Sequence, residues 1–272
     1  MSRRLTSFIL LFACLCGGWI AAAGAEPVRL RLATTTSTQD SGLLDVLHPE
    51  FERATGIAVD VIAVGTGKAL ALARNGDVDI VLAHDPAAEA QFVADGAGIE
   101  RAPVMTNDFV IVGPAADPAN VHDATGAADA LARIARTRSA FVSRGDQSGT
   151  HVKELALFAA AGVAPRGTWY LAAGQGMGPV LQIADEKPAY TLVDRGTWLA
   201  RRRSLSLRLL FERDASLLNP YHVIVVNPAR HPHVHVEAAR AYAAFLTGAA
   251  GQRRIAEYAI DGEPLFVPNP TP

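Results

Sequence analysis

Residues 141–157 read FVSRGDQSGTHVKELAL, and they place a short apolar strand, a polar turn and a helix in direct succession. Phe141 and Val142 are typical of the end of a buried strand, and apolar residues recur at helical spacing from Val152 onward. The first backbone N–H groups of a helix have no partner within the helix, and the helix dipole is positive at that end. This stretch therefore predicts a turn that can hold an anion.

The side chains of this turn are hydrogen-bond donors. Arg144 can form two parallel hydrogen bonds to one oxyanion, and Ser148 and Thr150 carry hydroxyl groups. Gly149 lets the backbone come close to a ligand. An ordinary strand-to-helix turn, with Ser148 or Thr150 as its N-cap, explains the same residues. This stretch alone leaves both interpretations open.

Three more turns repeat the order of strand, donor-rich turn and helix. ATTTSTQDSG follows a strand at residues 28–33, GTG follows a strand at 57–64, and GQGMG precedes a helix at 179–185. Alternating strands and helices predict parallel pairing, and ligands of such sheets bind beyond the carboxyl ends of the strands. Four donor-rich turns with one arginine favour an oxyanion cleft over four unrelated helix caps.

The order of the elements predicts two lobes. Two C-terminal helices follow an apolar strand at 221–226 and have no further sheet to cover, so they return the chain to the first lobe. The predicted division is a discontinuous lobe I at residues 26–108 and 219–272, with lobe II inserted at 109–218. The chain would then cross between the lobes near Asp108 and Asn219.

Two local features make further structural predictions. The sequence FVIVG predicts a short strand at residues 109–113. Pro49 lies inside a helical pattern that starts at Leu43, and it predicts a kink or a break in that helix.

Residues 1–25 have the pattern of a secretory signal peptide. Two arginines precede an apolar run at residues 8–16, and the sequence AGA at 23–25 offers a small-residue cleavage site. Cleavage after Ala25 is the preferred interpretation, and cleavage before Cys14 in a lipoprotein is the alternative. The predicted location of the mature protein is the periplasm.

Composition excludes several functions. Both cysteines, Cys14 and Cys16, fall in the leader, so the mature chain would have no thiol for a disulfide, a nucleophile or a metal site. The leader holds two of the 25 basic residues and no acidic one, which leaves 23 basic against 27 acidic residues and a net charge of −4. Nucleic-acid binders carry a basic face, so a nucleic-acid partner is not expected.

Six motifs follow one another between residues 33 and 228: ATTTSTQDSGLL, VGTGKAL, SRGDQSGTHVKE, GQGMGPVLQIADE, AYTLVDRGTWL and NPYHVIVVNP. Together they resemble the TupA family, the periplasmic tungstate-binding proteins of ABC transporters. The turn at Asp85 and Pro86 fits the same family. The resemblance implies an α/β fold of the type II periplasmic binding proteins, in which each lobe is a mixed, mostly parallel sheet flanked by helices and the ligand cleft lies between the lobes.

The resemblance also implies the ligand-binding residues. The positions that match the family pattern are Thr35, Thr36, Thr66, Arg144 and Thr150. The donor-rich turns themselves add Ser148, Gly176, Met177 and Gly178. No catalytic residue, no cofactor and no metal other than that of the oxyanion are expected.

The function that the resemblance implies is capture of tungstate, with molybdate as a second candidate, and delivery to an ABC permease and its ATPase. The receptor is expected to be a monomer and not an enzyme. Capture of phosphate or sulfate is the alternative among binding proteins. A secreted hydrolase acting on a phosphoryl or acyl group is the alternative from another class. The sequence GDQSG disfavours the hydrolase, because Ser148 comes one position too late for a G-x-S-x-G elbow.

Three alternating histidines, His231, His233 and His235, have no place in this interpretation. On a strand they would share one face and could bind zinc. The preferred interpretation is an exposed entry to the helix that follows Pro232.

Overall fold

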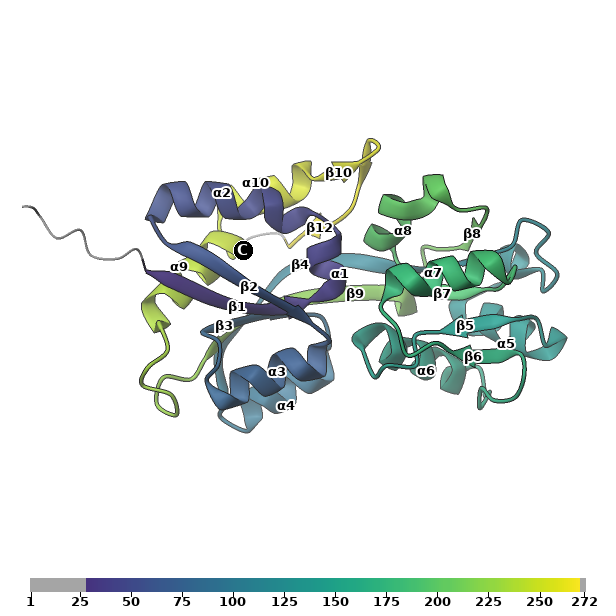
Figure 1. Cartoon of the computed structure of the whole chain (residues 1–272), viewed down its shortest axis with the longest axis horizontal. Helices are drawn as coiled ribbons and strands as arrows, with labels where there is room; N and C mark the ends of the chain where they lie inside the picture. The colour runs from purple at the N-terminus through teal and green to yellow at the C-terminus, as the bar shows by residue number, and fades with distance from the viewer. Residues whose placement is uncertain (1–27, 270–272) are drawn as a thin grey trace, which may run out of the picture.

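The computed structural model describes residues 28–269. The predicted signal peptide lies outside the described residues. Within residues 28–269, no helix combines the length and the apolar character needed to cross a membrane. Figure 1 shows two lobes side by side, joined by two long strands.

Lobe I is built on a mixed sheet with the strand order β12-β4-β9-β3-β1-β2. Strand β1 (Arg29–Thr35) runs parallel to β2 (Ala58–Val64) and to β3 (Ile80–Ala83). The next strands, β9 (Leu218–Val226), β4 (Gly98–Gly113) and β12 (Val267–Pro268), are added antiparallel. The carboxyl ends of β1, β2 and β3 therefore lie at one edge, which faces lobe II (Figure 1).

Helices cover both faces of this sheet (Figure 1). One face carries α2 (Leu43–Thr55), α9 (Val236–Thr247) and α10 (Ala249–Glu257), and the other carries α3 (Thr66–Asn75) and α4 (Pro86–Ala94). Side chains alternate between the faces of a strand. Accordingly, Val223 and Val225 of β9 pack on the α2 side, whereas Ile224 and Val226 pack on the α3 side.

Pro49 lies inside α2, yet the helix runs from Leu43 to Thr55 without a break. Of the two predicted outcomes the break is therefore wrong, and the kink stays a prediction. Leu43, Leu47 and Phe51, from both halves of the helix, are all fully buried against the sheet. This packing offsets the backbone hydrogen bond that proline cannot donate.

Lobe II has two strand groups. The second half of β4 pairs antiparallel with β7 (Thr191–Asp194) and β8 (Arg208–Phe211), and β5 (Phe141–Ser143) pairs in parallel with β6 (Tyr170–Ala172). The helices of this lobe are α5 (Ala127–Thr137), α6 (Gly149–Ala160), α7 (Met177–Glu186) and α8 (Arg195–Arg201). A separate apolar cluster between α5, α6 and β7 forms its core.

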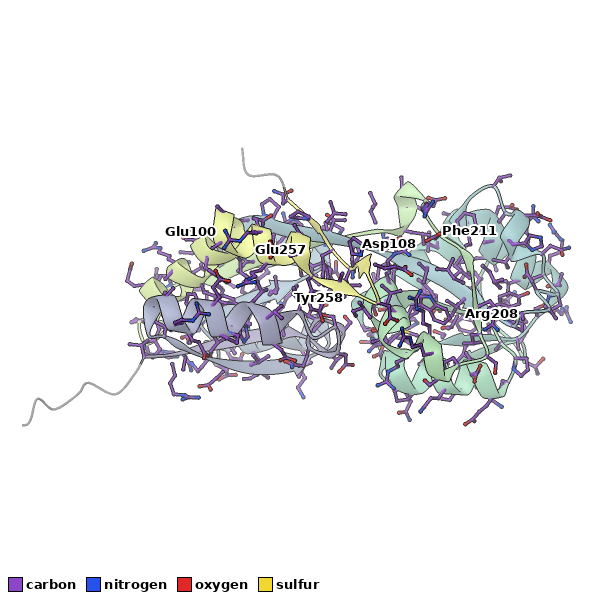
Figure 2. The ribbon with its side chains drawn as sticks, turned by 90° about the horizontal axis from the view of Figure 1, so that it is seen from above. Glu100, Asp108, Arg208, Phe211, Glu257 and Tyr258 are labelled. Carbon is purple, nitrogen blue, oxygen red and sulfur yellow. The ribbon has the colours of Figure 1, made fainter. Side chains whose placement is uncertain are left out.

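Strand β4 belongs to both lobes. It pairs with β9 as far as Asp108 and with β7 from Phe109 onward, and Figure 2 shows Asp108 at the junction of the lobes. The pattern FVIVG predicted only the last five residues of this strand. Its first half contains two register shifts, and Glu100 has a positive φ of 52°, so the alternation that marks a regular strand is interrupted there.

Candidate anion site

A small cavity lies between the lobes, where the donor-rich turns meet. Its volume is about 10 Å³, whereas pockets for organic ligands have volumes of roughly 300–1,000 Å³. Lobe I lines it with Thr35, Thr36, Ser37, Val64, Gly65, Thr66 and His84, and lobe II with Arg144, Ser148, Gly149 and Thr150. The size favours one small ion over an organic ligand.

Three helices begin at this cavity. Helix α1 (Thr36–Asp40) is capped by Thr35, whose hydroxyl accepts the N–H of Thr38 at 3.3 Å, and α6 is capped by Ser148. Helix α3 follows Gly65, which has no side chain to accept from its first N–H groups. Such helix starts offer backbone donors and a positive potential to an anion, although α1 has only five residues.

Two buried donors at the cavity have no hydrogen-bond partner within residues 28–269. They are Thr66 Oγ1 and Arg144 Nε, and their residues are only 2% and 5% exposed. A buried donor without a partner costs about 1–3 kcal/mol, and more when the group is charged. Two such donors on opposite walls of one cavity indicate a ligand that accepts hydrogen bonds from both.

Asp146 turns away from the cavity and back onto its own loop. One carboxylate oxygen accepts from Arg144 Nη2 at 2.5 Å, and the other accepts the N–H of Ser148 at 3.1 Å. Burial alone would raise the pKa of Asp146, but the hydrogen bonds from Ser148 and Arg144 outweigh it and hold the pKa below its usual value. The carboxylate therefore orients the arginine, and none of the cavity-lining residues, all within 28–269, is acidic.

His84 is a lining residue that the sequence motifs missed. It follows β3 at the same sheet edge, immediately before the turn at Asp85, and that position is the signal that could have identified it. Its Nδ1 donates to Asn219 Oδ1 at 2.9 Å, and its ring lies 4.7 Å from that of Tyr221. Burial lowers the pKa of His84, and the hydrogen bond to Asn219 offsets this only in part, so the imidazole is neutral at neutral pH.

A family model described as a PBP superfamily domain matches residues 21–250. The tungstate-binding protein TupA of Peptoclostridium acidaminophilum is 49% identical over 245 residues, which cover 88% of this chain and 85% of that protein. The chain belongs to the TupA family of periplasmic binding proteins.

Solved structures of TupA relatives agree with the fold described above. The tungstate ABC transporter protein from Geobacter sulfurreducens is 52% identical, with a TM-score of 0.80 over 85% of this chain and 98% of that one. TupA from Desulfovibrio alaskensis G20 is 45% identical, with a TM-score of 0.79 over 89% of this chain and 99% of that one. The expected two-lobed type II fold is confirmed.

The structure of this TupA-family chain brings six of the nine predicted ligand residues together. Those that line the cavity are Thr35, Thr36, Thr66, Arg144, Ser148 and Thr150. The other three start α7, outside the cavity lining: Gly176 is the N-cap, Met177 is buried in the core, and Gly178 packs against Arg201. The same turn, residues 174–178, contacts the loop that carries Arg144, because the N–H of Gly174 donates to the carbonyl of Arg144 at 2.8 Å.

The three histidines of this TupA-family chain do not form a metal site. Within residues 28–269, no group of three His, Cys, Asp or Glu side chains is placed to hold a metal ion. His231 and His233 instead bond through Nε2 to the carbonyl oxygens of Arg74 and Gly76, at 2.9 Å each. They satisfy backbone acceptors at the end of α3, where a helix leaves carbonyls unpaired.

Proposed function

We propose that this chain captures tungstate in the cavity between its lobes and delivers it to an ABC permease driven by an ATPase. It acts in the periplasm as a monomer, performs no chemistry and uses no cofactor. The similarity to proteins named for tungstate binding supports this proposal. The ligand-binding residues proposed are the six that line the cavity, and the turn at residues 174–178 acts by supporting the Arg144 loop through the N–H of Gly174.

The observation that carries the proposal is the pair of buried donors, Thr66 Oγ1 and Arg144 Nε, neither of which has a hydrogen-bond partner among the described residues. They belong to different lobes, so an oxyanion that accepts from both would hold the lobes together. The hydrogen bond to the arginine is charge-assisted and therefore the stronger of the two. Closure around a ligand is the usual motion of two-lobed binding proteins.

The absence of an acidic side chain from the cavity lining favours tungstate over phosphate. At neutral pH phosphate still carries a proton and requires an acceptor, whereas tungstate is a bare dianion that donors alone can satisfy. Asp146, which lies two residues from both Arg144 and Ser148 along the chain, is committed to these two residues. An acceptor turned into the cavity would repel a dianion in a poorly screened environment.

Calorimetric titration with tungstate, molybdate, sulfate and phosphate tests the proposal. We expect tungstate to bind most tightly or equally with molybdate, and phosphate to bind weakly. Absence of binding by all four anions would refute the assignment of the cavity, and tight binding of phosphate alone would refute the choice of ligand.

The variant Thr66→Val separates a ligand contact from a structural role. Because Thr66 Oγ1 is buried without a partner in residues 28–269, its loss should not lower the melting temperature of the ligand-free protein. The affinity for tungstate should fall about tenfold, as for loss of one hydrogen bond to a charged group. Thr247→Val on α9 is the matched control, since its hydroxyl bonds only a helix carbonyl, that of Ala243 at 2.9 Å, among the described residues.

A further inference from the structure

One buried carboxyl group near the cavity has no part in the function proposed above. Glu154 lies on α6, the helix whose first residues line the cavity, and it is 1% exposed. It comes five residues after Gly149, which corresponds to about 7.5 Å along the helix axis. A carboxylate that is buried this close to the cavity is repelled by the charge of any anion bound there.

Glu154 lies beneath the loop that carries Arg144. Its Oε1 accepts from the Tyr170 hydroxyl at 2.6 Å, and that hydroxyl lies 2.9 Å from Ser143 Oγ. Ser143 Oγ in turn accepts the N–H of Gly145 at 3.1 Å. The carboxyl group is therefore connected by hydrogen bonds to both sides of Arg144.

We propose that Glu154 takes up a proton from solvent when the dianion enters the cavity, so that capture is coupled to protonation of this positioning residue. The inference rests on the proposed function, because it requires a negatively charged ligand. Charge explains it. The cavity offers one guanidinium, already paired with Asp146, and a dianion adds two negative charges to it. A second buried negative charge nearby is then unfavourable, and protonation removes it.

Titratable and charged groups lie on each element packed around Glu154 and its helix. Tyr170 lies on β6, and Arg144 and Asp146 lie in the loop after β5. Strand β7 contributes the buried Asp194, whose pKa is also raised by burial. The charged groups of α5 are Asp129 and Arg133, which pair with each other at 2.9 Å, and Arg136, which is exposed.

The free protein keeps this carboxyl group ready to take up a proton. Burial raises the pKa of Glu154 to about 7, although hydrogen bonds from Tyr170, Ser143 and the Arg144 backbone act in the opposite direction. The group is therefore about half ionised near neutral pH. A dianion raises its pKa further, so the bound state holds more protons than the free state. Affinity must then be higher at lower pH and must fall as the pH rises through this range.

Calorimetry in two buffers of different ionisation enthalpy counts the protons. At about pH 7.5 we expect uptake of about half a proton per tungstate, and between about pH 7 and about pH 8.5 we expect the affinity to fall about fivefold to tenfold. Wild-type protein that binds tungstate without proton uptake overturns this inference and leaves the proposed function intact. Wild-type protein that does not bind tungstate at any pH overturns the proposed function itself.

Glu154→Gln identifies the group. The amide keeps the size of the side chain and an oxygen that can accept from Tyr170, but it cannot titrate. We expect proton uptake and pH dependence to disappear, and we expect Glu186→Gln, an exposed change on α7, to retain both. Equal loss of affinity at every pH with unchanged proton uptake would reveal a merely structural role and contradict the proposal.

Two other buried groups, His84 and Asp194, could take up the proton instead. Loss of uptake in His84→Gln or Asp194→Asn, with uptake retained in Glu154→Gln, overturns the assignment to Glu154. The carboxyl ¹³C resonance of Glu154 provides a measurement that needs no variant. It should titrate near neutral pH in the free protein and move to a higher pKa in saturating tungstate, and a resonance that does not respond to tungstate contradicts the inference.

Discussion

Replacing Gly149 with alanine should weaken ligand binding without weakening the fold. Gly149 is the first residue of α6 on lobe II, and its backbone lies against His84 and Thr66 of lobe I. A Cβ atom at this position would lie 3.0 Å from His84 Cε1, 3.3 Å from His84 Nδ1 and 3.5 Å from Thr66 Oγ1. The first two distances are shorter than ordinary van der Waals contacts, so His84 or the backbone at Gly149 has to shift.

His84 cannot easily move away from the new methyl group. Its ring is held by the hydrogen bond to Asn219 and by packing on Tyr221. Overpacking of this kind costs about 1–3 kcal/mol, and here the cost falls on the closed state alone. The affinity for tungstate should therefore fall about fivefold to 150-fold.

The stability of the ligand-free protein should change in the other direction. Alanine is a better helix former than glycine and should add up to about 1 kcal/mol to the free energy of unfolding. Calorimetry gives the affinity, and thermal unfolding without ligand gives the stability. Gly67→Ala, in the first turn of α3, is the matched control because no atom lies within 4 Å of its added Cβ. Wild-type affinity in Gly149→Ala would show that the bound state does not have the lobe contact described here.

Three further predictions concern charged groups. Arg144→Lys should lower tungstate affinity by about 1–3 kcal/mol, because an ammonium group cannot replace the planar guanidinium; calorimetry that finds wild-type affinity would remove Arg144 from the site. Asp146→Asn should weaken tungstate binding modestly through poorer orientation of Arg144, and the same titrations should detect no new phosphate binding. Arg202 of lobe II bonds Glu263 at 2.7 Å in the hairpin at residues 259–264, which extends from lobe I. This ion pair joins the two lobes, so its loss in Arg202→Gln should weaken the closed state and reduce the affinity for tungstate about twofold to fivefold at low salt. High salt should remove the difference between the variant and the wild type.

The sequence by itself determined the local chemistry of the site. Each donor-rich turn joins a strand to a helix within a few residues, and such turns depend on short-range periodicity, capping and glycine, all of which can be read from neighbouring residues. Arg144, Ser148 and Thr150 were predicted for this reason, whereas the resemblance to the TupA family singled out Thr35 and Thr66 within their turns. The structure places all five around one cavity. The order of the elements predicted two lobes, and the resemblance to the TupA family supplied the type II fold, which the comparisons confirm.

Only the tertiary structure decided which turns line the cavity and which of their polar atoms have no hydrogen-bond partner among the described residues. The start of α7 has the same local pattern as the other turns, yet it lies outside the lining, because its position depends on how α7 packs on lobe II. His84 has no motif of its own and enters the site through the register of β3 and its bond to Asn219, 135 residues away in the chain. The burial of Glu154, and the lack of a partner for Arg144 Nε within the described part of the chain, likewise arise from contacts between segments far apart in sequence. Burial and hydrogen-bond partners are set by the packing of the whole fold, so no local pattern contains them.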